Sequence, residues 1–319
     1  MLKHDVLCFG ETMAMFVAEQ PGPLAQVKSF SKAIAGADSN VAIGLRRLGL
    51  RVNWLSRVGN DSLGEFVLHS LREEGLDCSQ VQVDPVFPTG WQLKQRCDDG
   101  SDPQVEYFRR GSAASRMSTL QLNNELLQVR HVHATGIPPA LSASCRELSH
   151  QLLNAIRSAG GTVSFDPNLR PRLWPDHATM IREVNALAFK ADWLLPGIEE
   201  GRLLTGRDSP EGVAEYYLER GVQCVAIKLG AQGAYWQDAM GQQGYVPGQP
   251  VAQVVDTVGA GDAFAVGVLS ALLERLPLGV AVARGNWCGS RAVQYRGDMD
   301  GLPLRAELDQ YQATLSLQA

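Results

Sequence analysis

The chain lacks the features of a secreted, disulfide-stabilised or membrane-spanning protein. Its 319 residues include six widely spaced cysteines and no CxxC pair, so we expect reduced thiols with packing roles. The polar Lys3, His4 and Asp5 lead directly into a strand-like run without the apolar segment of a signal peptide, and we therefore expect a cytoplasmic protein. Asp256 and Asp262 interrupt the best apolar run before it reaches the roughly 18 residues of a membrane-spanning helix.

Clustered positive charge is also absent. The formal net charge is −5, and the basic residues are scattered along the chain. This pattern offers no footprint for nucleic acid or an anionic membrane and favours chemistry on a small molecule. His131 and His133 lie on one face of a predicted strand, but no cysteine or acid is spaced to complete a metal site, so we expect packing roles.

An alternating α/β pattern fills most of the chain. From about residue 120 onward, short β-rich runs alternate with helix-length segments, which is typical of a parallel sheet covered by helices. Strands are predicted at 129–134, 162–166, 193–195 and 222–228. Ligands of such sheets bind beyond the carboxyl ends of the strands. The length suits one main domain, so we predict a single unit over residues 1–319.

Two stretches, at about 12–34 and 89–111, depart from this pattern. In the second stretch, Gln92 and Lys94 alternate with Trp91 and Leu93, as in an extended strand. No internal repeat, low-complexity tract or linker sets these stretches apart from the rest of the chain. We expect them to form a small β layer that folds over the main domain as a lid.

The richest chemical segment is residues 256–264, which read DTVGAGDAF and lead into an apolar helix ending near residue 276. Two glycines just before a helix allow backbone N–H groups to converge at its N-terminus, where the helix dipole favours an anion. The segment therefore predicts a phosphate cradle that contains a carboxylate, Asp262. From spacing alone, an acid in the first helical turn is equally well explained as a cap or dipole partner.

Other glycine-loop and catalytic motifs fail on inspection. A dinucleotide fingerprint starting at Gly259 needs glycine or alanine where Phe264 stands, and a P-loop needs a Gly-Lys pair that the sequence does not contain. The G-x-S-x-G and H-E-x-x-H motifs are absent as well.

The DTVGAGDAF segment closely resembles the C-terminal signature of the PfkB/ribokinase family of carbohydrate kinases. Residues 35–42 (AGADSNVA), followed by Leu48-Gly49 and residues 57–61 (RVGND), resemble the family's N-terminal signature, so the likeness covers nearly the whole chain in order. The resemblance implies a ribokinase-like fold, with a mostly parallel central sheet flanked by helices and a small β-sheet lid. It also implies ATP-dependent phosphorylation of a sugar, with Mg²⁺ carried by ATP.

The resemblance implies catalytic and sugar-binding roles at both signatures. Asp262 is expected to accept the proton of the attacking sugar hydroxyl. The transferring γ-phosphoryl group is expected to be stabilised by the backbone N–H groups of Gly259, Ala260 and Gly261. In the N-terminal signature, the residues implied to hold the sugar are Gly36, Asp38 and Asn40. Read without the resemblance, that stretch is an ordinary capped helix start.

Further positions match the family's nucleotide side. The resemblance places Lys228, Gly230 and Gly233 beside the nucleotide, together with Asn168 and Asn286. Read alone, Lys228 is equally well a solvated strand end. Glu200 ends a segment that matches the family's N-x-x-E motif and is implied to organise magnesium through water, although Gly197 replaces the motif's asparagine. An exposed helix acid is the alternative interpretation of Glu200.

Two arginine-bearing segments, 107–115 (YFRRGSAAS) and 166–174 (DPNLRPRLW), resemble those of 2-keto-3-deoxygluconate kinases, as does 295–301 (YRGDMDG). In that subfamily, the residues matching Tyr107, Arg109 and Arg170 hold the substrate. Guanidinium groups suit a carboxylate, so a sugar acid fits better than ribose, adenosine or fructose. We expect Arg110 and Arg172 to lie in solvent instead.

Several alternatives stay open. Gln92 occupies a lid position that carries tyrosine in the subfamily, and an amide suits one more hydroxyl, so 2-ketogluconate is a rival substrate. A fructokinase- or ribokinase-type enzyme and a non-catalytic sugar-acid-binding relative are the further candidates, and Phe264 disfavours a nicotinamide-dependent dehydrogenase. The resemblance also leaves open a monovalent cation such as K⁺ near Asp256 and a homo-oligomer formed through the lid.

Overall fold

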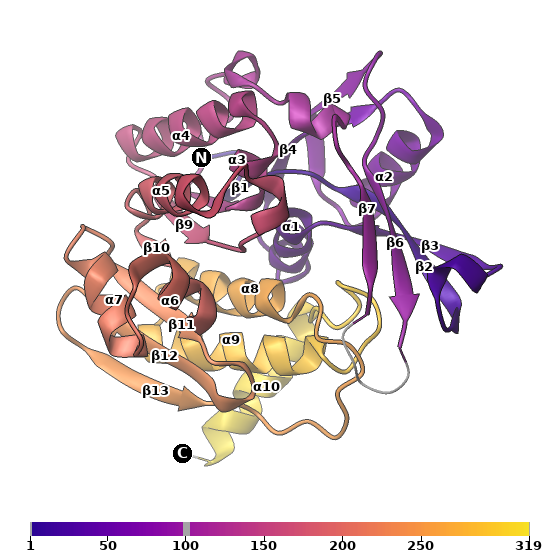
Figure 1. The fold of residues 1–319 in the computed structure, drawn as a ribbon. Coiled ribbons are helices and arrows are strands. Elements are labelled where there is room, and N and C mark those ends of the chain that lie inside the picture. The colour runs from indigo at the N-terminus through magenta and orange to yellow at the C-terminus, as the bar shows by residue number, and fades with distance from the viewer. Residues whose placement is uncertain (1, 98–102, 319) are drawn as a thin grey trace.

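The computed structural model describes residues 2–97 and 103–318, and its centre is a large, mostly parallel sheet (Figure 1). Within the described residues, nine strands follow the order β13-β12-β11-β10-β9-β8-β1-β4-β5. Every neighbouring pair is parallel except β11 with β12 and β12 with β13. The strands are β1 (Val6–Phe9), β4 (Val52–Gly59), β5 (Asp77–Asp84), β8 (His131–Thr135), β9 (Thr162–Asp166), β10 (Trp193–Leu194), β11 (Cys224–Lys228), β12 (Gly233–Asp238) and β13 (Gln243–Pro247).

The four strands predicted from about residue 120 onward are confirmed. The strand at 162–166 has the predicted bounds, whereas those predicted at 129–134 and 222–228 each begin two residues later, as β8 and β11. Their residues are almost entirely buried. Strands that are covered on both faces consist of nearly continuous apolar residues. This pattern explains why these strands could be predicted from the sequence.

Helices cover both faces of the sheet and enclose two apolar clusters. One face is covered by α1 (Ala37–Arg47), α2 (Ser62–Glu73), α8 (Ala260–Leu273), α9 (Leu278–Ala292) and α10 (Arg305–Gln318). The other is covered by α3 (Ile137–Leu141), α4 (Ala143–Ser158), α5 (His177–Ala188), α6 (Ile198–Thr205) and α7 (Pro210–Leu218). Side-chain caps mark several helix starts: Asp61, Ser142, Asp176 and Ser209 each accept a hydrogen bond from a backbone N–H of the first turn.

A smaller sheet stands beside the main one, and Figure 1 shows it on the side of α2. Its order is β3 (Phe30–Ala35), β2 (Met13–Pro21), β6 (Trp91–Arg96) and β7 (Val105–Phe108). These strands fall within the predicted stretches 12–34 and 89–111, except that β3 ends one residue later at Ala35; residues 98–102 of the second stretch lie outside the described residues. Side chains alternate across β6, so that Gln92 and Lys94 share a buried face opposite Trp91.

Cysteines and histidines have the packing roles expected of them. The six cysteines are unpaired, and five are buried. His131 and His133 are fully buried in β8 and share the hydroxyl of Ser164 at 2.8 Å each. Burial lowers the pKa of both imidazoles, which favours their neutral forms. Over residues 2–97 and 103–318, no helix is long and apolar enough to cross a membrane.

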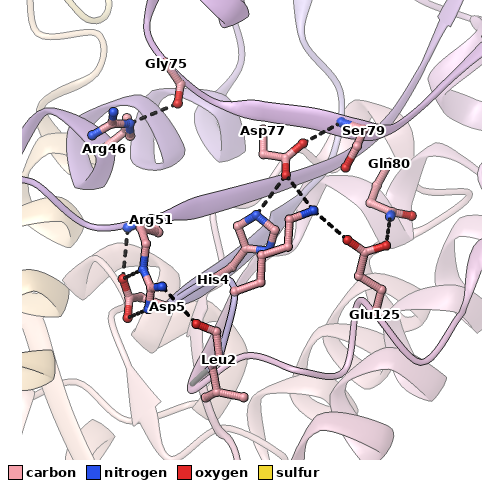
Figure 2. Close-up of polar contacts among 11 residues, drawn as sticks. Leu2, His4, Asp5, Arg46, Arg51, Gly75, Asp77, Ser79, Gln80 and Glu125 are labelled. Atoms are coloured by element: carbon pink, nitrogen blue, oxygen red, sulfur yellow. Dashed lines mark hydrogen bonds and ion pairs between the residues drawn. The ribbon is translucent and has the colours of Figure 1, made fainter.

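The amino ends of β1, β4 and β5 carry a polar network, which Figure 2 shows. Asp77 accepts hydrogen bonds from His4 Nε2 and from the backbone N–H of Ser79, at 2.8 Å each. Nearby, Asp5 pairs with Arg51, with 3.0 Å between Oδ2 and Nε. The network ties the N-terminal segment to two neighbouring strands and lies at the opposite end of the sheet from the site described next.

Candidate active site

A cavity of about 550 Å³ lies between the carboxyl ends of the main strands and the smaller sheet. Its floor includes Glu11, just beyond β1, with Asp166 at the end of β9 and Lys228 at the end of β11. Gln92 and Tyr107 enter from the smaller sheet. The cavity therefore occupies the position where ligands of parallel α/β sheets bind.

The turn before α8 forms one wall of this cavity, as the sequence predicts. Gly259 has a φ of +84°, which favours glycine, and a Cβ built on it would lie 2.4 Å from the backbone oxygen of Asp298. The turn therefore needs glycine both for its conformation and for a close backbone contact. Because α8 begins at Ala260, its first N–H groups and its dipole are oriented to bind an anion at this end.

Asp262 lies in the first turn of α8 and is 8% exposed. Asn40 Nδ2 donates to one carboxylate oxygen at 2.8 Å, and Asn168 Nδ2 approaches the other at 3.4 Å. Burial raises the pKa of Asp262, although the Asn40 hydrogen bond and the charges of Lys228 and Arg170 act in the opposite direction. A carboxylate held by amides and made more basic by burial is suited to accept a proton.

Lys228 lies below the same turn and is paired with Asp166, with 2.6 Å between Nζ and Oδ2. Its Nζ would lie 3.5 Å from a Cβ built on Gly261. Burial lowers the pKa of Lys228, but the carboxylates of Asp166 and Glu200 outweigh it and raise the pKa above its ordinary value. The ammonium group thus stays charged beside this turn.

A second cavity, of about 320 Å³, lies on the other side of the turn. It shares Lys228, Thr257 and Gly261 with the first cavity, so the two meet at the turn. Its remaining walls are mainly glycine backbone and apolar side chains. The predicted nucleotide-side residues that line it are Lys228, Gly230, Gly233 and Asn286, and Ala260 of the turn before α8 joins them.

Glu200 uses both carboxylate oxygens to fix backbone. Its Oε2 accepts from the N–H of Gly197 and its Oε1 from the N–H of Leu169, at 2.8 Å each. It therefore joins the start of α6 to the segment after β9, while also lining the first cavity. Within the part of the chain that the structure describes, no group of three or more His, Cys, Asp or Glu side chains is arranged to hold a metal ion.

Both predicted substrate arginines line the first cavity, but their surroundings differ. Arg170 is exposed, and among the described residues its guanidinium donates to the neighbouring Leu169 carbonyl, at 3.0 Å. Arg109 is buried, and its Nε donates to Glu11 at 2.7 Å. Arg170 therefore has an exposed guanidinium group that can bind a ligand, whereas Glu11 already compensates much of the charge of Arg109.

Two predicted residues differ from the sequence expectation in the cavity that they line. The side chain of Asp38 does not line either cavity. It is 1% exposed and packs so closely against Gly10 that a Cβ on that glycine would overlap it. Asn168, expected beside the nucleotide, lines the first cavity near Asp262. The remaining predicted residues of the sugar side, Gly36, Asn40, Gln92 and Tyr107, line the first cavity. Arg110 and Arg172 are exposed and line neither, as expected.

The sequence reasoning missed three charged residues of the first cavity: Glu11, Lys94 and Asp298. Glu11 follows the first strand closely, so its position at the carboxyl end of a parallel strand was a usable signal. Lys94 shares a strand face with Gln92, and this alternation was visible in the sequence. Asp298 belongs to segment 295–301, whose only signal in the sequence is its resemblance to a subfamily.

Comparison with known proteins agrees with this geometry. The model of the pfkB family of carbohydrate kinases matches residues 3–305. The chain belongs to this family. It is 52% identical to a 2-dehydro-3-deoxygluconokinase of Bacillus subtilis over 309 residues, which is 96% of this chain and 95% of the relative.

Two solved structures of the family share the fold. A PfkB protein from Polaromonas sp. JS666 has a TM-score of 0.89 and 50% identity, covering 96% of this chain and 99% of its own. A ribokinase II-type protein from E. coli, solved with ATP and Mg²⁺, has a TM-score of 0.89 and 27% identity, covering 98% and 99%. The chain is therefore an ATP-dependent sugar kinase with a ribokinase-like fold.

Proposed function

We propose that this kinase transfers the γ-phosphoryl group of ATP to a hydroxyl of a 2-keto sugar acid, preferentially 2-keto-3-deoxygluconate. This acceptor is also called 2-dehydro-3-deoxygluconate, the compound in the name of the 52% identical relative. The observation that carries the proposal is that Arg170 and Arg109 line the same cavity as Asp262. A neutral sugar needs no guanidinium group, whereas a carboxylate gains charge-assisted hydrogen bonds from one.

In this proposal the two cavities divide the substrates. The acceptor occupies the cavity of Asp262, Asn40 and Gln92, with Gly36 backbone and Tyr107 at its walls. The nucleotide occupies the cavity of Asn286, Gly230 and Gly233. The γ-phosphoryl group then lies at the turn where the cavities meet, in reach of the N–H groups of Gly259, Ala260 and Gly261.

Transfer requires a base, a fixed phosphoryl group and a leaving group whose charge is stabilised. Asp262 takes the proton of the attacking hydroxyl as its oxygen bonds to the γ-phosphorus, and the bond to the β–γ bridging oxygen breaks to leave ADP. Lys228 and the turn N–H groups stabilise negative charge on the transferring group. Positioning and electrostatics therefore account for catalysis without a covalent enzyme intermediate.

Magnesium fits this site as a ligand of the nucleotide. The carboxylates near the turn are engaged: Asp166 pairs with Lys228, and Glu200 accepts two backbone hydrogen bonds. Glu200 would act on the ion through water, and Mg²⁺ would neutralise charge on the β- and γ-phosphates. A K⁺ ion near Asp256 would compete with Lys94, because the ammonium group of Lys94 already contacts that carboxylate.

The smaller sheet has two further roles in the proposal. Residues 1–319 act as one kinase unit in which this sheet closes over the acceptor as a lid. Its other face carries Trp91 stacked on Phe108, with ring centroids 3.9 Å apart, and Phe108 is 44% exposed. A second copy of the chain covering this face would give a homo-oligomer, which light scattering measures. The cytoplasmic location stays a prediction from the sequence.

A phosphorylation screen tests the proposal. Purified protein with ATP and Mg²⁺ is assayed for ADP release with 2-keto-3-deoxygluconate, 2-ketogluconate, gluconate, fructose and ribose. The highest kcat/KM is expected for 2-keto-3-deoxygluconate. A higher value for fructose or ribose would overturn the sugar-acid proposal, and no turnover with any of the five would favour a non-catalytic binding protein.

The rival acid, 2-ketogluconate, is favoured by Gln92, whose buried amide lines the acceptor cavity. The variant Gln92→Tyr tests which of the two acids the enzyme prefers. If this position reads the 3-hydroxyl, the variant shifts the kcat/KM ratio toward the 3-deoxy acid. An unchanged ratio would mean that Gln92 does not select between the two acids.

A further inference from the structure

Lys94 is a buried cation that the kinase mechanism above does not use. Its side chain is 2% exposed, although it belongs to the small four-stranded sheet. The ammonium nitrogen lies 2.6 Å from Asp256 Oδ2 and 2.7 Å from Asp298 Oδ1, and it donates to the Arg296 carbonyl at 3.4 Å. Lysine is almost never fully buried unless it is paired, so this placement needs a reason.

Both carboxylates bound by Lys94 flank the turn that holds the transferring phosphoryl group. Asp256 starts the turn, and its Oδ1 accepts from the backbone N–H of Val258 at 3.0 Å. Asp298 contacts the turn through its backbone, since a Cβ on Gly259 would collide with its carbonyl oxygen. Three segments distant in sequence therefore converge on one ammonium group: strand β6, the turn and the loop after α9.

Without a cation here, two buried carboxylates would oppose the chemistry of the turn. Burial is the main cause that raises the pKa of Asp262, and the charge of Asp298 adds to it; burial also raises the pKa of Asp298, and the charges of Asp256 and Asp300 add to it. An uncompensated pair would also repel the γ-phosphate from the turn. Burial lowers the pKa of Lys94, but Asp298 and Asp256 outweigh it and raise the pKa above its ordinary value, so the ammonium group is charged.

We propose that Lys94 is the built-in cation of the catalytic turn, joining the smaller sheet to Asp256 and Asp298 and making an added monovalent cation unnecessary. Lys94 is a positioning residue: it acts on the phosphoryl group through the turn. Since Gln92 lies two residues away on the same strand face, the strand that contacts the acceptor also fixes the turn. The proposal rests on the kinase activity but not on which sugar is the acceptor.

Cation dependence tests this role, using whichever sugar the wild type phosphorylates best. Turnover of the wild type is measured with KCl, NH₄Cl or tetramethylammonium chloride at equal ionic strength, and we expect rates within about twofold of one another, because Lys94 already supplies the charge. Lys94→Ala should lose about tenfold or more in kcat with tetramethylammonium and recover part of it with NH₄⁺ or K⁺. A matched variant, Lys94→Met, fills the space without charge and should not recover.

Thermal unfolding gives a second readout that needs no turnover. NH₄⁺ or K⁺ should raise the Tm of Lys94→Ala relative to tetramethylammonium, and should leave the wild type and Lys94→Met unchanged. Lys32→Ala is the control, because Lys32 lies on the same sheet over the Phe66 ring, 4.0 Å from its centroid, and away from the turn.

Two results would overturn the proposal. One is a wild type whose kcat falls tenfold or more when K⁺ is replaced by tetramethylammonium, which needs no variant to fold. The other is Lys94→Ala with wild-type kcat in tetramethylammonium. Failure of the proposed function gives a different result: the wild type would phosphorylate no sugar, or would prefer a sugar other than the proposed acid. The Tm measurement on Lys94→Ala does not depend on turnover and would still test the role of Lys94.

Discussion

Charged clusters occupy both ends of the main sheet, and they differ in exposure and in what they contact. At the amino end, Lys3 and Arg51 have side chains 57% and 52% exposed, and their partners are other side chains or backbone of the same network (Figure 2). At the carboxyl end, Asp166 is buried, as is Lys94 of the facing smaller sheet, and the groups around them line a cavity. Burying charge is costly, so buried charges that surround a cavity indicate a site where a ligand interacts with them.

The comparison predicts different consequences of substitution at the two ends. Exposed ion pairs contribute about 0.2 to 1 kcal/mol each to stability, because water screens them. A buried charge that loses its partner costs about 3 to 5 kcal/mol. Changes at the amino end should therefore affect stability slightly and catalysis hardly at all, while changes at the carboxyl end should affect catalysis first.

The largest expected effect is that of Asp262→Asn. Loss of the base should lower kcat by about 10²- to 10⁴-fold while ATP and acceptor still bind. Burial raises the pKa of Asp262, so its charged form costs stability as pH rises above the ordinary carboxyl range, and the neutral amide should leave the free energy of unfolding at pH 7 equal or higher. Single-turnover kinetics and urea unfolding measure the two effects. A kcat within tenfold of wild type contradicts the assignment of the base.

Arg170→Ala is expected to act mainly on acidic acceptors. The lost charge-assisted hydrogen bond should lower kcat/KM for 2-keto-3-deoxygluconate by about 10- to 150-fold. The matched control is Arg172→Ala, because Arg172 is an exposed arginine two residues later that lines neither cavity. Fructose phosphorylation in parallel should fall far less. Equal losses for the acid and for fructose would refute a carboxylate contact.

Arg109 gives a less direct test because Glu11 depends on it. Arg109→Ala would leave the fully buried Glu11 carboxylate without its ion-pair partner, at a cost of about 3 to 5 kcal/mol of stability. The double variant Arg109→Ala with Glu11→Gln removes both charges. Its Tm should lie above that of Arg109→Ala alone, and a double variant no more stable than the single one would contradict the pairing.

The smallest effect is expected at the amino end, for Asp77→Asn. Burial would raise the pKa of Asp77, but hydrogen bonds from Ser79 and His4 and the charge of Lys3 lower it to about 2. A depressed carboxyl pKa stabilises the fold above the unfolded-state pKa near 4, and the benefit is lost as pH falls toward 2. The variant should lose about 1 kcal/mol between pH 5 and 7, with a shrinking difference below pH 4, and keep wild-type kcat. A tenfold loss of kcat would mean that the two ends are not independent.

Features of the fold and the site could be predicted from the sequence where neighbouring residues specify them, and not where they depend on tertiary contacts. Strand β9 and the turn before α8 were predicted correctly, because consecutive residues specify a buried strand and a two-glycine turn. Asp38 and Asn40 belong to the same first turn of α1, and only the tertiary packing shows that Asn40 reaches Asp262 while Asp38 packs against Gly10. Side-chain direction within a helical turn cannot be read from residue type.

The ion pairs around the site could not be predicted from the sequence for a similar reason. Glu11 meets Arg109 98 positions away, and Lys94 meets Asp298 across 204 positions. No periodicity or motif links residues so distant. The sequence therefore predicted two substrate arginines of equal standing, and only the contacts reveal that Glu11 compensates one of them.

The most direct test of the account compares two acceptors that differ only in charge. Wild-type kcat/KM is measured for 2-keto-3-deoxygluconate and for its primary amide, which keeps the shape and the hydroxyls but has no carboxylate. The account predicts about 10- to 150-fold preference for the acid, and a preference that largely disappears in Arg170→Ala. Equal kcat/KM values for acid and amide in the wild type would contradict the claim that the buried, charged end of the sheet recognises a sugar acid.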